Sequence, residues 1–222
     1  MTIICKTLIL FCFLLTMVLN AQEIITDIDG HQYETVKIGK QVWMKENLKT
    51  TRYNNGDTIG TTYPDTLDIS NETMPKYQWA YEGDKKYVEV YGRLYTWYTI
   101  TDSRKVCPSG WHVPSLNEWK ELFDFLGSGK IAAGKLKEAG TSHWESPNSY
   151  ANNESGFTAL PAGSRWLYGE FAQLGKHGHY WASDEQYPGY AGRILLRFDD
   201  NISKQIGSSY PKNAWPVRCI KD

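Results

Sequence analysis

The sequence lacks the features that mark the commonest membrane proteins and enzymes. Beyond an apolar run from Leu8 to Leu19, no segment approaches the ~20 apolar residues that a spanning helix needs. There is no GxSxG, no HExxH, no phosphate-binding glycine loop, no EF-hand spacing and no internal repeat. The sequence therefore supports no hydrolase, and we assign no catalytic residues and expect no cofactor other than, at most, calcium.

The sequence also lacks an excess of charge of either sign. It has 24 basic and 25 acidic residues. Without residues 1–21 it loses only Lys6, so the net charge becomes 23 − 25 = −2. Such a chain has no electrostatic attraction for nucleic acid or for anionic lipid, and we expect neither as a partner.

The first 21 residues have the pattern of a secretory signal peptide. Lys6 precedes the apolar run, and the small Ala21 precedes a polar segment. Cleavage there leaves 222 − 21 = 201 residues, which fits a single domain over residues 22–222. Cys5 and Cys12 are badly placed for a lipid anchor at the cleavage site. We expect an exported protein, either secreted or held at the cell surface without lipid.

Cysteine is scarce, with four in the chain and two of them in the predicted signal peptide. The remaining Cys107 and Cys219 most simply form a disulfide in an oxidising compartment. That disulfide would close a loop of 113 residues, counted inclusively. A loop of this length is expected to add about 4 to 5 kcal/mol to the free energy of unfolding. The alternative, that one of them is a nucleophile, would leave the other thiol open to oxidation.

The stretch CPSGWHVPSLNEWKELFDFLG predicts a capped helix. Ser115 followed by Glu118 is a capping box, and Gly127 is a typical helix end. Between them, apolar residues at spacings of three and four form one face, which includes Trp119 as a core residue. His112 has no obvious partner in the sequence, so we expect a structural role for it.

The rest of the chain predicts short strands and loops, an α+β fold with two short helices. Alternation around Gly30 and Gly39 indicates an amino-terminal β-meander. Residues 50–86 are polar and predict loop, residues 94–101 have helical spacing, and KIAAGKLKEAG suggests a further turn of helix. GHYWASDE, GRILLRFDD and WPVRCIKD predict three strands, with a hairpin turn at Asp200 and Asn201.

Aromatic residues are abundant, with nine Trp and fifteen Tyr. A core built with few long helices accounts for most of them. Five aromatic residues fit a core less well, because they lie among polar and glycine residues: Trp144, Trp166, Tyr168, Tyr187 and Tyr190. Exposed aromatics of this kind stack on sugars or anchor protein partners.

Two metal sites can be considered. His177 and His179 in HGH would lie on one side of a strand, but a structural zinc site needs four ligands and nothing nearby completes the set, so we expect two polar loop residues. Calcium is a possible cofactor, because it takes six to eight oxygen ligands. Its candidate ligands come from one loop and from WASDE: Asn148, Asn152, Asn153, Glu154, Asp184 and Glu185.

Several motifs together resemble a known family. DIDGHQYETVKIGKQVWMKENLK, YGRLYTWYT, CPSGWHVPSLNEW, NESGFTALPAG, YWASDE and VRCIKD resemble the Fibrobacter succinogenes major paralogous domain over nearly the whole predicted mature chain. The resemblance implies an exported bacterial protein with a C-type-lectin-like fold, distantly similar to formylglycine-generating enzymes. Those enzymes use a pair of thiols and copper. Cys107 and Cys219 lie where the family has its fold-closing pair, which leaves no thiol for copper.

Two functions are favoured, and a cysteine oxidase is a third, less favoured one. The first is a non-catalytic binding module for a glycan or protein, and the second is a structural component of the cell envelope. For the first, we expect a binding face within residues 163–192, because loops on rigid scaffolds commonly carry recognition. The candidate ligand-binding residues are Arg165, Trp166, Tyr168, Glu185, Tyr187 and Tyr190.

Overall fold

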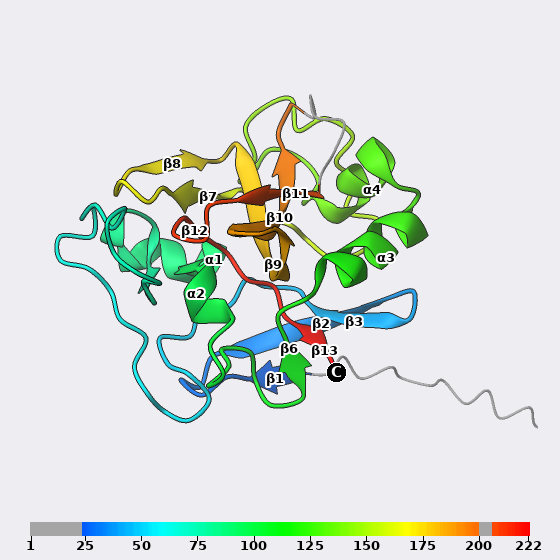
Figure 1. Cartoon of the computed structure of the whole chain (residues 1–222). Helices are drawn as coiled ribbons and strands as arrows, with labels where there is room; N and C mark the ends of the chain where they lie inside the picture. Colours follow the sequence, from blue (N-terminus) through cyan, green and yellow to red (C-terminus); the bar gives the residue numbers. More distant parts are fainter. Residues whose placement is uncertain (1–23, 200–205) are drawn as a thin grey trace, which may run out of the picture.

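The computed structural model describes residues 24–199 and 206–222 (Figure 1). The predicted signal peptide and the predicted turn at Asp200 and Asn201 lie outside these ranges. Among the helices of the described part, none combines the length and the apolar character that crossing a membrane requires. Antiparallel sheets dominate, with a few short helices, as an α+β fold predicts.

The first sheet joins strands from both ends of the described chain in the order β1-β2-β3-β13-β6 (Figure 1). Its strands are β1 (Ile24–Thr26), β2 (Gln32–Ile38), β3 (Gln41–Met44), β13 (Ile220–Lys221) and β6 (Trp111–His112). β1, β2 and β3 form the predicted meander. β13 lies between β3 and β6, with Ile220 opposite both Trp43 and His112.

Two further sheets complete the fold. The second has the order β4-β5-β12-β7-β8, and the third has the order β11-β10-β9. The second comprises β4 (Gln78–Trp79), β5 (Leu94–Thr96), β12 (Ala214–Trp215), β7 (Ala162–Arg165) and β8 (Phe171–Leu174). The third comprises β9 (His177–Tyr187), β10 (Tyr190–Arg197) and β11 (Ile206–Ser209). The strands predicted in GHYWASDE and GRILLRFDD are thus confirmed, whereas WPVRCIKD divides between β12 and β13.

The helices are short, and more numerous than the two predicted. They are α1 (Val88–Tyr91), α2 (Trp97–Ile100), α3 (Leu116–Leu126) and α4 (Gly129–Leu136), with 3-10 turns η1 (Tyr81–Gly83) and η2 (Lys85–Tyr87). The helix predicted over residues 94–101 is only half right. Leu94–Thr96 pairs with β4 and β12 as a strand, because sheet hydrogen bonds override a short stretch of helical spacing.

Helix α3 begins and ends as predicted. The Ser115 hydroxyl accepts from the Glu118 backbone N–H, the Glu118 carboxylate accepts from the Ser115 N–H at 2.7 Å, and Gly127 is left-handed with φ 107°. Trp119 is 1% exposed, with its ring 4.7 Å from that of Trp43. The helix therefore packs its apolar face into the core, and its polar ends are satisfied locally.

The third sheet packs one face on this core. Tyr180 and Ala182 of β9 and Ile194 and Leu196 of β10 are fully buried in the same cluster as Trp119. Because strand side chains alternate, the residues next to these along each strand, which include His179 and Arg193, point to the opposite face of the sheet.

The predicted disulfide between Cys107 and Cys219 is confirmed, with both cysteines buried. It joins the loop before β6 to the segment before β13. Because β6 and β13 are also neighbours in the first sheet, the disulfide and the sheet hold the same two segments together.

His112 has more partners than its sequence context suggests. Its Nδ1 lies 2.6 Å from Asp222 Oδ1, and its Nε2 lies 2.9 Å from Glu118 Oε1. Burial alone would lower the pKa of His112, but the hydrogen bonds to Asp222 and Glu118 outweigh it and raise the pKa. His112 therefore links β6, the cap of α3 and residue 222, which is a structural role.

Candidate functional site

One face of the third sheet places polar side chains beside aromatic ones. His177, His179 and Trp181 are two residues apart along β9, so they share a face. On β10, Arg193 lies opposite Trp181 and Leu195 lies opposite His179, and directly opposed side chains point the same way. The sheet thus gathers two imidazoles and a guanidinium on the side away from α3.

The side chains of His177, His179, Arg193 and Leu195 line a pocket of about 390 Å³, which we call the histidine pocket. Its volume lies within the range of small-molecule sites. β12 and the segments around residues 166, 173 and 208–213 complete it. The full lining is Trp166, Gln173, His177, His179, Tyr190, Arg193, Leu195, Ser208, Ser209, Tyr210, Asn213 and Trp215. This lining contains aromatic, amide, hydroxyl and cationic groups, and none of its residues is acidic.

Stacked rings support the pocket. The His179 ring lies nearly parallel to that of Trp215, with centroids 4.7 Å apart, and Trp215 packs on Trp181 at 4.2 Å. His179 Nε2 is 3.1 Å from the side-chain oxygen of Gln173. At the rim, the rings of Tyr190 and Tyr210 are 5.2 Å apart and both are exposed. The inner residues are thus held in place, and the outer tyrosines face solvent.

Both histidines are neutral at pH 7. Burial, with smaller contributions from Arg197 and other cations, lowers the pKa of His177 to about 4. Burial, followed by the nearby His177 and Arg193, holds the pKa of His179 well below its usual range. With Gln173 accepting at Nε2, neutral His179 carries its proton there, and Nδ1 is left as an acceptor.

The histidine pocket concentrates polar atoms that have no partner. In the described part of the chain, eight buried side-chain nitrogen or oxygen atoms lack a hydrogen bond. Four belong to residues of this lining: His177 Nδ1, His179 Nδ1, Arg193 Nη1 and Trp215 Nε1. Each such atom costs about 1 to 3 kcal/mol when it is left unsatisfied. A cluster of them in one pocket is typical of a site that a ligand completes.

A larger hollow lies elsewhere, between the β2–β3 turn and α3. It measures about 610 Å³ and is lined by residues 37–41 with Glu121 and Phe125. None of the eight unpartnered buried atoms belongs to this lining. The histidine pocket is therefore the better candidate site.

The family model for the Fibrobacter succinogenes major domain matches residues 36–221. The chain belongs to this family. Comparison with curated proteins and with solved structures found no match. The match begins within β2 and ends within β13, so the Fibrobacter succinogenes major domain contains the whole histidine pocket.

Arg165 does not lie where a ligand could reach it, and its predicted role in binding is wrong. It is 0% exposed, and its guanidinium donates to the backbone carbonyls of Asp65 at 2.9 Å and of Leu67. It also lies over the Trp79 ring at 4.0 Å. Burial lowers its pKa to about 10. Arg165 therefore holds the 65–67 loop in place through these hydrogen bonds and is not placed to contact a ligand.

The other predicted binding residues are spread over the surface. Trp166 and Tyr190 line the histidine pocket, whereas Tyr168, Tyr187 and Glu185 are exposed outside its lining. Trp144, which the sequence placed among the doubtful aromatics, is 1% exposed and donates to the Ala159 carbonyl at 2.9 Å. It is a core residue of the domain.

In the loop that would supply calcium ligands, three of the four candidate side chains use their oxygens within the protein, whereas the buried Asn148 Oδ1 has no partner among the described residues. The side-chain oxygen of Asn152 accepts from the Glu154 N–H, and that of Asn153 accepts from the Thr158 N–H. Glu154 pairs with Lys135 at 3.0 Å. Asn148 is buried, and its amide donates to two backbone carbonyls. These contacts fix the loop against the end of α4.

Two acidic residues of the predicted calcium set, Asp184 and Glu185, lie on β9. Asp184 accepts from the Leu116 N–H at the start of α3 at 2.7 Å, and Glu185 is exposed opposite Ala191. Among the described residues, no group of three or more His, Cys, Asp or Glu side chains is placed to hold a metal. Asp184 is thus bound to the start of α3, while the 148–154 loop is bound beside α4.

His177 and His179 line the histidine pocket but were not among the candidate residues chosen from the sequence. The sequence does place them on one side of a strand, as the structure has them, but their interpretation as polar loop residues is wrong. Alternation over HGHYW is the signal that could have found them, since it puts both histidines on the face opposite the buried Tyr180.

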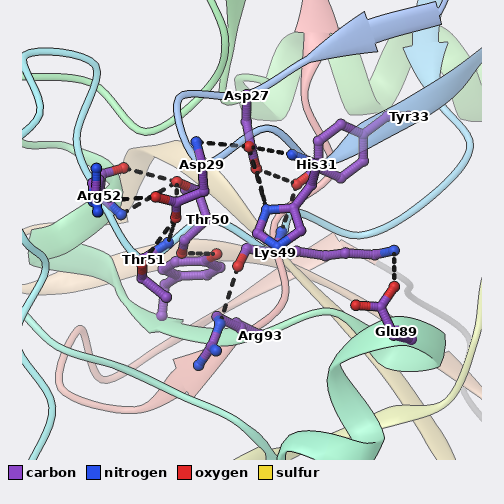
Figure 2. Close-up of polar contacts among 11 residues, drawn as sticks. Asp27, Asp29, His31, Tyr33, Lys49, Thr50, Thr51, Arg52, Glu89 and Arg93 are labelled. Carbon is purple, nitrogen blue, oxygen red and sulfur yellow. Dashed lines mark hydrogen bonds and ion pairs between the residues drawn. The ribbon is translucent and has the colours of Figure 1, made fainter.

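A second polar cluster lies near the start of the described chain, and its groups are paired with one another (Figure 2). Asp27 accepts from the Tyr33 hydroxyl at 2.6 Å and pairs with the His31 ring at 3.0 Å. Asp29 accepts from the Thr51 N–H and hydroxyl. Burial would raise the pKa of Asp29, but the hydrogen bonds from Thr51 and Thr50 and the charge of Arg52 outweigh it and lower the pKa. These contacts join the β1–β2 turn to residues 49–52, a structural role.

Proposed function

We propose that this protein is an exported, non-catalytic binding module that recognises a glycan, and that the histidine pocket is its binding site. The observation that carries the proposal is the group of four unpartnered buried nitrogens in one pocket beside aromatic rings. Sugar rings offer both the hydroxyls that such nitrogens bind and the apolar faces that stack on aromatic residues.

The rim supports the same role. Tyr190 and Tyr210 are 40% and 55% exposed and contact each other, so a sugar entering the pocket would meet their rings first. Tyrosine presents a large rigid surface at low conformational cost, which suits a recognition surface. Ser208, Ser209 and Asn213 add short polar groups beside these rings.

The test is a glycan array with residues 22–222, in calcium and in chelator. We expect binding that the double change Tyr190→Ala and Tyr210→Ala abolishes. The matched control, Tyr168→Ala with Tyr187→Ala, removes two tyrosines that are more exposed and lie outside the pocket lining, and it should leave binding unchanged. An array without any bound glycan, or equal loss in both double variants, would contradict the proposal. Loss in chelator alone would support the calcium ion suggested by the sequence.

Export and a C-type-lectin-like architecture belong to the same proposal. The apolar amino-terminal run and the disulfide are typical of exported chains. A first sheet that includes β1 and β13, closed by a disulfide, agrees with the lectin-like fold that the family motifs imply. Cell fractionation tests export, and comparison of a crystal structure with lectin folds tests the architecture.

No comparable observation supports the two alternative functions, a cysteine oxidase and a structural component of the cell envelope. A cysteine oxidase needs free thiols, and both cysteines of the described chain are joined in the disulfide. An envelope scaffold would need no pocket with unsatisfied polar atoms. We therefore propose binding as the function. If the glycan array shows no binding and partner capture succeeds, the ligand is a protein.

A further inference from the structure

We infer that the histidine pocket selects an anionic sugar, whose carboxylate or sulfate group pairs with Arg193. This inference rests on the proposed function and names the class of glycan. It starts from the charge of the lining, in which Arg193 is accompanied by neutral groups and no acidic residue.

Arg193 is a half-buried cation that has no counter-ion among residues 24–199 and 206–222. Its Nη1 is buried and unpartnered, and burial alone lowers its pKa, with no acid acting on it. An arginine with an ordinary pKa of about 12.5 still keeps its charge at pH 7. An unpaired buried charge is costly, so the position favours an anion that arrives from solution.

The neighbouring cations show the contrast. Arg197 binds Asp199 through two contacts of 2.8 Å, and Lys176 lies 3.8 Å from Glu145. Arg197 and Lys176 therefore already have acidic partners. In the described part of the chain, Arg193 differs from them because it lines the pocket and has no acidic partner.

The remaining unpartnered groups complete the recognition of a sugar acid. Trp215 Nε1–H is a donor for an anionic oxygen, and the free Nδ1 of His179 is an acceptor for a hydroxyl. Gly207 lies opposite Arg193 on β11, and a Cβ there would come within 3.5 Å of the guanidinium. That is an ordinary contact distance, so the Arg193 side chain lies against β11 at Gly207.

The experiment compares matched ligands. Galacturonic and glucuronic acid, their methyl esters, galactose and galactose 6-sulfate are titrated into the protein, with fluorescence and calorimetry as readouts. We expect at least one free acid or the sulfate to bind about tenfold or more tightly than its uncharged counterpart, since hydrogen bonds to charged groups are the stronger ones. Comparing the affinities of the two uronic acids with that of galactose 6-sulfate shows whether the pocket prefers a carboxylate or a sulfate group.

Variants then assign the preference to one side chain. Arg193→Gln should bring the acid-to-ester ratio close to one, and Arg193→Lys should keep part of it. Lys40→Gln removes the same charge from the exposed β2–β3 turn and should leave the ratio unchanged. Thermal unfolding of Arg193→Gln checks folding, and we expect no loss of stability because no protein partner of Arg193 is removed.

The outcomes separate this inference from the proposed function. Array binding to neutral glycans that still depends on Tyr190 and Tyr210 would support the function and overturn the anionic preference. Equal affinity for acid and ester, no binding of any charged sugar, or an unchanged ratio in folded Arg193→Gln would each overturn the inference as well.

Discussion

Buried arginines in this protein differ in what their guanidinium groups contact. Arg218 is 1% exposed and donates to the Asn47 side chain at 2.9 Å and to the backbone carbonyls of Lys45 and Phe157 at 2.6 and 2.7 Å. Arg165 likewise binds carbonyls. Arg193 Nη1, by contrast, has no hydrogen-bond partner in the part of the chain that the structure describes. Residue type and burial alone therefore do not separate an arginine bound within the protein from one that lines a pocket.

Arg218→Ala should lower the free energy of unfolding by about 3 kcal/mol or more. The change leaves several buried acceptors without a donor, and each costs about 1 to 3 kcal/mol. Chemical denaturation measures the loss, with Arg193→Gln as the matched arginine variant that should show none. A fully stable Arg218→Ala protein would contradict this account of the core.

Among the elements, α3 is the one whose contacts follow most directly from local sequence. Trp119→Ala should cost roughly 3 to 5 kcal/mol through the cavity it leaves, and Ser115→Ala about 1 kcal/mol through loss of the cap. Phe125 is on the same helix but 65% exposed. Phe125→Ala is therefore the control, with an expected loss below about 1 kcal/mol. Comparable losses for Trp119→Ala and Phe125→Ala in urea denaturation would show that α3 does not pack as described.

The sequence predicted elements that depend on neighbours in the chain. The capping box, the Gly127 end and the meander around Gly30 and Gly39 are local patterns, and the structure contains each of them. The sequence could not predict β4, because this two-residue strand lies within a polar loop and forms only by pairing with β5.

The site was predictable only in part, for the same reason. Arg165 is buried by carbonyls from residues about a hundred positions earlier, which no local pattern shows. Trp166 and Tyr190 were predicted as binding residues and do line the pocket. Arg193 and His179 depend on the pairing of β9 with β10 and on Trp215 from a different sheet.

At the scale of the whole molecule, the disulfide closes a long loop. Cys107 and Cys219 are 112 residues apart in sequence. In the chain-entropy model a loop of this size contributes about 4 to 5 kcal/mol, chiefly by restricting the unfolded chain.

Cys219→Ser should therefore lower the free energy of unfolding by about that amount. The double change Cys107→Ser with Cys219→Ser should match reduced wild-type protein, which controls for a free thiol. Denaturation with and without reductant makes the measurement. Identical midpoints for oxidised and reduced wild type would contradict the expected stabilisation.

The position of β13 in the first sheet has a consequence for the order of events during synthesis. Residues 220–221 lie between strands formed by residues 41–44 and 111–112 (Figure 1). As the chain emerges from the ribosome or from an export channel, β3 and β6 appear long before the strand that separates them. The sheet therefore stays open until residue 221 is free, and a chain interrupted earlier exposes two unpaired strand edges, the kind of surface that chaperones bind and that aggregates.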